Sequence, residues 1–513
     1  MTSLPPSLCT PSAFSYPLLP DISILSLTAT QVSNITKHVP ELLYFNHPAV
    51  TAENVSFCNI TVTYTHTQSD TPNPPSTANI LLPTSNWNTR LQALGGGGYT
   101  AGFTAATADA MIAAVSEGYA ALTTDGGHSA SNTPATWALK PDGSANYNAI
   151  HNFALLSLGD SALIAKSIIH SAYGTPPTYS YWTGCSQGGR QGLALAQHYP
   201  DAYEGIVASA PAISWPRFAI GGLWPQVVMD VMGVYPSGCE IQVISTRAVE
   251  ECDLVDGRAN GVVLEPEGCA FDPFSLVGVE VNCTGSGPVV ISEAAAAVVD
   301  AAWTGARDAK GEFLWYGFER GTVLAGASGT AADTDCSNGT CVGAPNELYM
   351  QWAKVFVEKN LDFNLSGLAH EEFDHLFRKS VQQWGVAYST DSPDLSAFRD
   401  RGGKMLGYHG LMDEVIPPKG TRAYYESVRA LDANVHDYYR FFEAPMMAHC
   451  YGTKGGYPSS IFDSMVAWVE NGTVPESLPA TYTPEAEVEL EGVLCPYPQK
   501  ARAGEDGGTY CAE

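Results

Sequence analysis

The sequence lacks several features that would place it in familiar classes of protein. No apolar run is long enough to span a membrane, and no Cys-x-x-Cys pair of the zinc-binding or redox type occurs. Residues 1–5 lack the charged and apolar regions of a signal peptide, so either no signal peptide exists or it was removed and a Met added. Basic residues are scarce: 25 Lys and Arg against 53 Asp and Glu leave a formal net charge of −28. That balance argues against nucleic acid or an anionic membrane as a partner.

What is present indicates a large globular protein from an oxidising compartment. The 513 residues, 45% of them hydrophobic, suffice for one large domain with a sizeable insertion, or for two domains. The twelve cysteines, an even number, suit a disulfide framework. Asn-x-Ser/Thr sequons permit glycosylation at Asn34, Asn54, Asn59, Asn282, Asn338, Asn364 and Asn471. We therefore expect a secreted, extracellular protein.

A Gly-x-Ser-x-Gly sequence at residues 184–188 is the strongest sign of catalysis. The β-branched and aromatic run 178–183 before it predicts a buried strand, and residues 192–199 behind it predict a helix that ends at Pro200. A strand that turns sharply into a helix through flanking glycines exposes the central serine beside the positive end of the helix. Ser186 is therefore the candidate nucleophile.

Strands and helices alternate on both sides of this motif. Strand patterns occur at 57–65, 79–82, 91–94, 120–124, 203–211, 404–408 and 438–442, and helix patterns at 109–117, 147–158 and 161–172. This alternation predicts an α/β fold with a mostly parallel sheet that is covered on both faces. From about residue 214 to 399 the alternation is lost, in a stretch that holds six of the twelve cysteines. We expect a catalytic domain of residues 1–213 and 401–513 and an inserted lid domain of residues 214–400.

Two side chains that follow later strands are placed to activate the serine. A serine hydroxyl needs a base to take its proton and an acid to orient that base. Asp413 follows one predicted strand, and His449 follows the next. The chain order Ser186, Asp413, His449 is that of the α/β-hydrolases. The alternatives are Glu414 as the acid and His409 or His128 as the base.

Four consecutive glycines, residues 95–98, follow the strand predicted at 91–94. Glycine lets the backbone approach a ligand closely and present its N–H groups, and an esterase builds its oxyanion hole in such a loop. We expect the N–H of Gly97 or Gly98 to act together with the N–H of Gln187. The alternative is a flexible linker, which the nearby strand and helix disfavour.

The residues next to the nucleophile and the base are both cysteines. Cys185 precedes Ser186, and Cys450 follows His449. If the serine and histidine are within hydrogen-bond reach, the two cysteines lie a few ångströms apart and should form a disulfide. Such a bridge would fix the distance between nucleophile and base.

Together these motifs resemble the fungal tannase and feruloyl esterase family, over nearly the whole chain. The resemblance is carried by Gly184-Cys185-Ser186-Gln187-Gly188-Gly189-Arg190-Gln191-Gly192, Tyr199-Pro200, Ala210-Pro211-Ala212, Gly402-Gly403-Lys404, His409-Gly410-Leu411-Met412-Asp413 and Ala448-His449-Cys450. It implies an α/β-hydrolase fold with a large inserted lid domain, the Ser186–Asp413–His449 triad, the Cys185–Cys450 bridge and the hydrolysis of esters of plant phenolic acids.

The stretch 252–262 resembles the family's calcium loop. Closely spaced carboxylate and amide oxygens on a turning backbone suit Ca²⁺, although this is not the EF-hand pattern. The resemblance implies side-chain ligands from Asp253, Asp256 and Asn260 and carbonyl ligands from Arg258 and Val262. Asn260 stands where a third Asp is expected, which removes one charge, and the alternative is a solvated acidic turn. We expect this calcium to be structural, and no organic cofactor.

We pair the remaining cysteines as Cys9–Cys58, Cys239–Cys283, Cys252–Cys269, Cys336–Cys341 and Cys495–Cys511. The predicted function is that of a serine carboxylic ester hydrolase, monomeric or homodimeric, acting on small phenolic esters or on esters of tannins and plant cell walls. Galloyl and feruloyl esters are equally favoured. Aromatic side chains of the lid are expected to hold the acyl ring, among Trp215, Phe218, Trp224, Trp303, Trp315 and Tyr316. The alternatives are an esterase or acyltransferase for other aromatic esters, and a non-catalytic binding protein.

Overall fold

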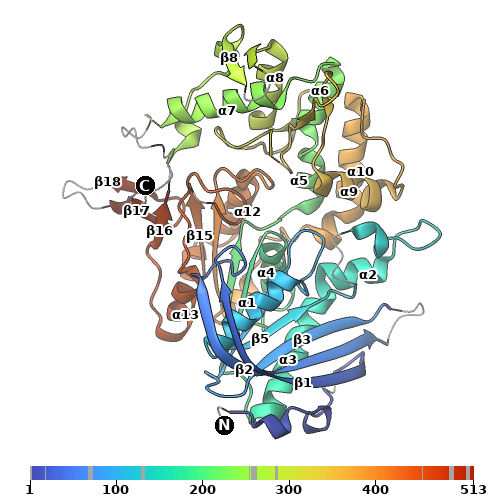
Figure 1. Ribbon diagram of the computed structural model, residues 1–513, viewed down its shortest axis with the longest axis vertical. Helices are drawn as coiled ribbons and strands as arrows, with labels where there is room; N and C mark the ends of the chain where they lie inside the picture. The colour runs from blue at the N-terminus through green and yellow to red at the C-terminus, as the bar shows by residue number, and fades with distance from the viewer. Residues whose placement is uncertain are drawn as a thin grey trace.

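The computed structural model has a sheet domain, lower in Figure 1, and a helical insert above it. It describes the chain except residues 1–2, 18, 68–72, 129–132, 254, 256–260, 262, 284–286, 328, 453, 484–489, 504–508 and 513. The insert lies between two neighbouring strands of the sheet, β7 (Gly205–Ser209) and β14 (Lys404–Gly410). The chain therefore leaves the sheet after β7 and returns beside it.

A nine-stranded sheet, in the order β1-β2-β3-β5-β4-β6-β7-β14-β15, forms the sheet domain. Its other strands are β1 (Ile22–Val39), β2 (Val50–His66), β3 (Ser76–Pro83), β4 (Arg90–Leu94), β5 (Ala120–Thr124), β6 (Tyr179–Cys185) and β15 (Tyr439–Ala444). The strands from β5 to β15 in this order are parallel, whereas β1, β2 and β3 form an antiparallel part that joins β5. This mostly parallel sheet confirms the predicted α/β fold.

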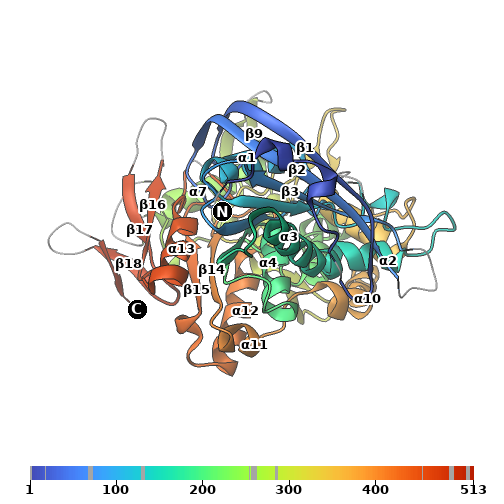
Figure 2. The same cartoon turned by 90° about the horizontal axis from the view of Figure 1, so that it is seen from below.

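Helices cover both faces of the sheet (Figures 1 and 2). Leu406 and Phe442 pack with α1 (Ala105–Ser116) and α13 (Ile461–Asn471) on one face. Their chain neighbours Met405 and Phe441 pack on the other face, because successive side chains of a strand alternate. That face carries α3 (Ser157–Tyr173), α4 (Gln187–His198) and α12 (Pro418–Leu431). Short helical turns of this domain are η1 (Pro6–Leu8), η2 (Pro11–Ala13), η3 (Pro134–Thr136) and η8 (Val435–Asp437).

The insert is mainly helical, and its core continues into the sheet domain. Its helices are α5 (Trp215–Gly221), α6 (Trp224–Met232), α7 (Gly238–Cys252), α8 (Glu293–Thr304), α9 (Glu347–Gln351), α10 (His370–Tyr388) and α11 (Ser396–Asp400), with the turns η5 (Pro266–Gly268), η6 (Pro273–Leu276) and the π-helical η7 (Trp352–Glu358). Three small hairpins pair β8 (Glu280–Cys283) with β9 (Gly287–Val290), β10 (Ala306–Arg307) with β11 (Phe313–Trp315), and β12 (Thr334–Asp335) with β13 (Val342–Gly343). One buried cluster joins Trp352 and Phe356 of the insert to Tyr99 and Phe153 of the sheet domain.

A continuous helical run covers Tyr147–Tyr173, formed by α2 (Tyr147–His151), the π-helical η4 (Asn152–Leu156) and α3. Among the described residues this run alone is long and apolar enough to cross a membrane by length and composition, and 61% of its most apolar window is buried inside the protein. It packs against β3, β5 and α4. In this structure it serves as a core helix.

All six predicted disulfides are formed: Cys9–Cys58, Cys185–Cys450, Cys239–Cys283, Cys252–Cys269, Cys336–Cys341 and Cys495–Cys511. The last of them ties together two C-terminal hairpins, β16 (Leu478–Tyr482) with β17 (Leu490–Leu494) and β18 (Lys500–Ala503) with β19 (Thr509–Ala512). Of the seven sequon asparagines, six are exposed and Asn59 is half-buried in β2.

Candidate active site

Ser186 sits at a sharp turn between β6 and α4. Its backbone angles, φ 62° and ψ −121°, belong to a strained region that L-residues seldom occupy. A Cβ on Gly184 would lie 2.6 Å from the backbone of Gly188, so the turn closes only because position 184 carries glycine. The Ser186 N–H donates to the carbonyl of Ser209 on β7 at 3.1 Å. The predicted strand–turn–helix context is present, and strain at this point is typical of a nucleophile elbow.

The candidate acid and base meet beyond the ends of β14 and β15. His449 Nδ1 donates to Asp413 Oδ2 at 2.7 Å. The N–H groups of Val415 and Ile416 donate to Asp413 Oδ1 at 2.8 Å each. The proton on Nδ1 leaves Nε2 of His449 as the proton acceptor of the ring.

The surroundings of this pair shift both pKa values toward the charged forms. Burial alone would raise the pKa of Asp413, but the charge of His449 and hydrogen bonds from His449 and His409 hold it below its ordinary range. Burial alone would lower the pKa of His449, but the charges of Asp413 and Glu414 and the Asp413 hydrogen bond raise it above 6.5. Asp413 is therefore ionised, and it stabilises a protonated His449.

The alternative acid, Glu414, and the alternative bases, His409 and His128, make other contacts. Glu414 accepts the backbone N–H of His449 at 3.1 Å and does not bond the ring. His409 is fully buried and donates through Nε2 to Asp413 Oδ2 at 3.0 Å, which makes it a second histidine on the same carboxylate. His128 is buried and stacked on Trp137, with ring centroids 4.2 Å apart.

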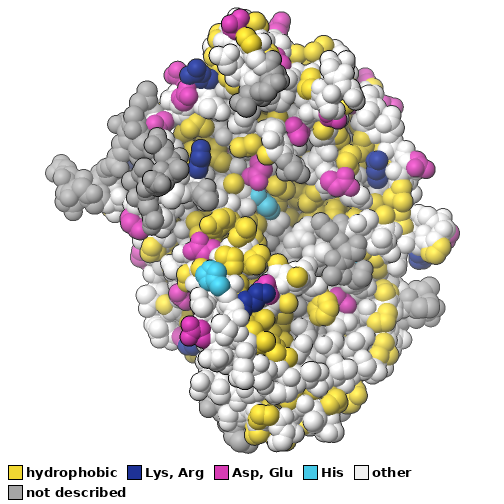
Figure 3. Space-filling model, in the orientation of Figure 1, with side chains coloured by type: hydrophobic (Ala, Val, Ile, Leu, Met, Phe, Trp, Pro, Cys, Tyr) yellow, Lys and Arg dark blue, Asp and Glu magenta, His cyan; other side chains and the backbone are white. Residues whose placement is uncertain are grey.

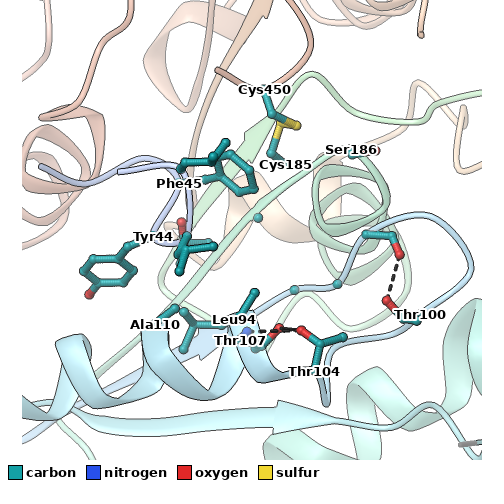
Figure 4. Close-up of a pocket in the computed structure, with 18 of the residues that line it drawn as sticks. Tyr44, Phe45, Leu94, Thr100, Thr104, Thr107, Ala110, Cys185, Ser186 and Cys450 are labelled. Atoms are coloured by element: carbon teal, nitrogen blue, oxygen red, sulfur yellow. Dashed lines mark hydrogen bonds between the residues drawn. A yellow bond between two sulfur atoms is a disulfide. The ribbon is translucent and has the colours of Figure 1, made fainter. Parts of the chain in front are cut away.

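The Cys185–Cys450 bridge joins the elbow to the histidine loop, with Cα atoms 5.8 Å apart. The Tyr408 hydroxyl donates to the Cys450 carbonyl at 2.7 Å, which fixes the bridge to β14 as well. Phe45 packs against the bridge (Figure 4). The bridge therefore couples the nucleophile strand β6 to the loop that carries His449.

The glycine loop lies directly beside the elbow. Gly96 uses its N–H for the side chain of Gln191 at 3.0 Å, and its carbonyl accepts the N–H of Gly188 at 2.9 Å. In the described part of the chain, the N–H groups of Gly97, Gly98 and Gln187 make no hydrogen bond. These are the three donors that the sequence predicts for an oxyanion hole, and they are left available to a ligand.

A cavity of about 420 Å³ opens beside the serine. Ser186, His449 and both cysteines of the bridge line it, together with the glycine loop, the segment 42–45 and the first turns of α1 (Figure 4). Hydrophobic side chains and histidine also gather on the outer surface where the insert meets the sheet domain (Figure 3). Neither the segment 42–45 nor its contact with the cavity is predicted by the sequence, because a short apolar segment between two strands carries no catalytic signature.

The lid aromatics that the sequence singles out pack mainly inside the insert. Trp215, Phe218, Trp303 and Trp315 are buried, and Trp224 and Tyr316 are half-buried. None of the six is among the residues that line the 420 Å³ cavity. Contact of these side chains with the acyl ring stays a prediction.

The predicted calcium loop is only partly described. Asp253 caps the C-terminal end of α7, and its carboxylate accepts the N–H of Gly261 at 3.0 Å. The other four predicted ligands, Asp256, Arg258, Asn260 and Val262, lie outside the described residues. The described residues alone contain no group of three or more His, Cys, Asp or Glu side chains placed to hold a metal. Calcium stays a prediction.

A strained serine elbow in a parallel sheet, with an Asp–His pair beyond the next strands in the order Ser, Asp, His, defines a serine hydrolase of the α/β-hydrolase fold. Residues 58–513 match the family model described as "Tannase and feruloyl esterase". The chain belongs to this family, and it is a carboxylic ester hydrolase.

Individual relatives agree with this assignment. A probable feruloyl esterase from Arthroderma benhamiae is 36% identical over 475 residues, covering 91% of this chain and 85% of that protein. A mono(2-hydroxyethyl) terephthalate hydrolase from Piscinibacter sakaiensis is 30% identical over 474 residues, covering 82% and 77%. The solved structure of a tannin acyl hydrolase from Aspergillus niger matches with a TM-score of 0.88 at 25% identity, covering 100% of this chain and 96% of that chain.

Proposed function

We propose that this protein hydrolyses esters of phenolic acids through an acyl-enzyme on Ser186. The observation that carries the proposal is the 2.7 Å hydrogen bond between Asp413 and His449, in a cavity wall shared with the strained serine. Phenolic acid esters are the natural substrate class for a member of this family, since its relatives include a feruloyl esterase and a tannin acyl hydrolase.

The proposed reaction has two halves. His449 Nε2 takes the proton of the Ser186 hydroxyl as Oγ attacks the ester carbonyl, and Asp413 stabilises the imidazolium that forms. The N–H of Gln187 and that of Gly97 or Gly98 stabilise the negative oxygen. His449 then gives its proton to the leaving alcohol. In the second half, His449 takes a proton from a water molecule, whose oxygen attacks the acyl-enzyme carbonyl. His449 then returns that proton to Ser186 Oγ as the bond to the acid breaks, which releases the acid and the free serine.

The test is acid release from methyl gallate and methyl ferulate, followed by chromatography. We expect turnover of at least one ester, and we expect Ser186→Ala to abolish it. A preference for gallate would make the protein a tannase, and a preference for ferulate would make it a feruloyl esterase. Activity that survives in Ser186→Ala would overturn the mechanism.

A second candidate substrate is a mono-ester of terephthalate, because a relative at 30% identity carries that name. The same assay with mono(2-hydroxyethyl) terephthalate as a third substrate separates the two. Added acceptor alcohol would reveal acyl transfer as a new ester product. Failure to turn over any ester would favour a non-catalytic binding protein.

We also propose a structural Ca²⁺ in the lid loop, held by Asp253, Asp256, Asn260 and the carbonyls of Arg258 and Val262. The donor set of carboxylate, amide and carbonyl oxygens fits a hard cation, and the Cys252–Cys269 bridge closes the loop that carries it. No step of the reaction passes through this ion. Chelation should therefore lower the melting temperature before it lowers turnover; loss of turnover at an unchanged melting temperature would contradict this role.

We further propose that the protein is secreted and is a monomer or a homodimer. Six disulfides and six exposed sequon asparagines are the features that favour an extracellular location. The native mass of the secreted protein, measured with and without glycosidase treatment, tests both points. A fall in mass on treatment shows glycosylation, and the mass of the treated protein gives the number of chains.

A further inference from the structure

We propose that the 420 Å³ cavity beside Ser186 binds the alcohol arm of the ester, and that it suits an apolar alcohol such as butyl or benzyl alcohol. This inference rests on the proposed esterase function and adds a substrate subsite to it. The subsite is formed by the sheet domain, not by aromatic side chains of the lid.

The position of the cavity decides which arm of the ester enters it. A bound ester places its carbonyl carbon at Ser186 and its carbonyl oxygen toward the free N–H groups of the glycine loop. The leaving oxygen must then face His449, because that ring protonates it. The cavity wall contains His449 and both Cys185 and Cys450, as well as the glycine loop that faces the carbonyl oxygen. We assign the group that fills this cavity to the leaving oxygen because His449, which protonates that oxygen, lines it.

The chemistry of the wall decides which alcohol it suits. Leu42, Leu43 and Phe45 line one side, and Leu94 and Ala110 line another. The described lining residues include no Asp, Glu, Lys or Arg. The volume lies within the range of small-molecule pockets, roughly 300–1,000 Å³. An apolar alcohol gains free energy by leaving water for such a wall, whereas a sugar would need more polar partners.

Three threonine hydroxyls of the wall are already hydrogen-bonded within the protein. The Thr104 and Thr107 hydroxyls lie 2.9 Å apart and bond each other, and Thr107 also donates to the carbonyl of Gly102. The Thr100 hydroxyl donates to the carbonyl of Gly97 at 2.7 Å. These hydroxyls bond neighbouring groups of the protein and not a ligand, which adds to the apolar character of the subsite.

Segment 42–45 is held rigidly against the nucleophile strand. Its neighbour Asn46 is fully buried, with φ 73°. The Asn46 carboxamide donates to Thr183 on β6 at 2.9 Å and accepts from Ser209 on β7 at 2.7 Å. Phe45 packs on the Cys185–Cys450 bridge. A wall fixed to the strands around the elbow recognises shape at little entropic cost.

The test uses two ester series. The first keeps one accepted acid and varies the alcohol from methyl to butyl and benzyl, and the second keeps methanol and varies the acid. We expect kcat/KM to rise about tenfold or more from the methyl to the butyl ester, because each buried methylene contributes about fourfold. In the acid series, the ratios of kcat/KM between different acids should stay the same when residues of the cavity are substituted.

Two variants with matched controls locate the subsite. Ala110→Leu fills the cavity from α1, and Ala108→Leu makes the same change on the exposed face of that helix. Leu42→Ala removes an exposed wall residue, and Leu25→Ala removes a leucine of nearly equal exposure, 53% against 54%, on β1. We expect the butyl-to-methyl ratio of kcat/KM to fall at least threefold in Ala110→Leu and Leu42→Ala, and to stay at the wild-type value in both controls.

Each remaining outcome counts against the assignment. A flat alcohol series, or a ratio that the four variants leave unchanged, would overturn the subsite while the esterase function stands. Variants that change the acid series in place of the alcohol series would assign the cavity to the acyl arm and overturn the proposal. If no ester in either series is hydrolysed, the proposed function itself fails, and the subsite falls with it. Ser186→Ala in the same assay distinguishes enzymatic from spontaneous hydrolysis.

Discussion

Asp413 binds two histidines with one oxygen atom. Its Oδ2 accepts from His449 Nδ1 at 2.7 Å and from His409 Nε2 at 3.0 Å. His409 Nε2 also faces the carbonyl of Ile416, and its Nδ1 faces the Thr421 hydroxyl at 2.9 Å. Since two acceptors face Nε2, that atom carries the proton, and the Thr421 hydroxyl donates to Nδ1. His409 is thus a positioning residue that acts through Asp413.

Removal of this second histidine should disturb the first. We expect His409→Leu to lower kcat about tenfold, the value of one hydrogen bond to a charged group. Without the competing donor, Asp413 holds the His449 proton more tightly, so the acid limb of kcat/KM should move to higher pH. His409→Gln keeps a donor and should restore part of both effects. A purely structural role would lower the melting temperature and leave the pH profile unmoved.

The pH dependence of activity follows from the raised pKa of His449. The free base is needed, so kcat/KM should fall as the pH drops through that pKa, which lies above 6.5. Glu414 is one of the negative charges that raise it. Glu414→Gln removes this charge, so we expect the acid limb of kcat/KM to move to lower pH by about half a unit. Gln can still accept the backbone N–H of His449, so the position of the loop is kept. The exposed Glu53→Gln should leave the limb in place. An acid limb that does not move in Glu414→Gln would show that Asp413, and not Glu414, raises the pKa of His449.

At this scale the sequence predicts where the candidate reacting groups lie in the fold, but not the contacts that support them. Ser186, Asp413 and His449 were predicted because each follows a strand, and parallel strands bring their carboxyl ends to one edge of the sheet. The hydrogen bond from His409 to Asp413 forms because the chain turns between these two residues and because Thr421 of α12 orients the His409 ring. The sequence does not predict either contact. A histidine four residues before a candidate acid was the available signal.

For two of the elements that differ from the sequence pattern, the structure shows the physical reason. Gly159 suggests a break between two helices, but the run 147–173 is continuous. A Cβ on Gly159 would lie 2.4 Å from the Tyr199 ring, so this glycine serves close packing. β1 was not predicted, since it is an edge strand with many exposed positions and left-handed φ at Asn34, which blurs the period-two pattern.

The clearest functional element is the bridged pair of segments around Cys185 and Cys450. We expect the double variant Cys185→Ala/Cys450→Ala to lose ten- to a hundredfold in kcat, roughly the cost of misplacing a catalytic group by about 1 Å. The chain-entropy model also predicts a loss of stability on the order of 5 kcal/mol for so long a loop. Assays are therefore made well below the melting temperature of the variant.

A second bridge supplies the control for that prediction. Cys495→Ala/Cys511→Ala opens the C-terminal hairpins, which carry neither nucleophile nor base. It should lower stability without a comparable loss in kcat. Equal turnover in both double variants would mean that the hydrogen bonds around Asp413 position His449 without help from the bridge.

On the scale of the whole molecule, the insert and the sheet domain are joined by opposite charges. Three carboxylates of the insert face cations of the sheet domain: Glu319 meets Lys419, Glu267 meets Arg422, and Glu265 meets Lys500 and Arg502. The sequence shows an excess of acidic residues but does not predict these pairs, because their members lie roughly 100 to 240 residues apart in the chain. The burial of the lid aromatics is a second whole-molecule property that no local pattern contains.

Arg422 is the centre of this charged interface. It binds Glu443 of β15 at 2.5 Å and also Glu267 of the insert, and its own side chain is 16% exposed. Burial raises the pKa of Glu443, and Arg422 opposes that rise. In Arg422→Met the largely buried Glu443 carboxylate loses its partner, so we expect the free energy of unfolding to fall by about 3 kcal/mol.

Three comparisons decide whether Arg422 acts through this buried charge. Arg247→Met breaks an exposed pair, 55% exposed on both sides, and should cost less than about 0.5 kcal/mol. Adding Glu443→Gln to Arg422→Met removes the unpaired charge and should recover part of the stability. The Arg422→Met insert should also be cleaved faster by a protease, because its contact with the sheet domain is weakened. Equal losses for Arg422→Met and Arg247→Met in denaturant melts would mean that the apolar core shared by the two parts, and not their charges, holds the insert against the sheet domain.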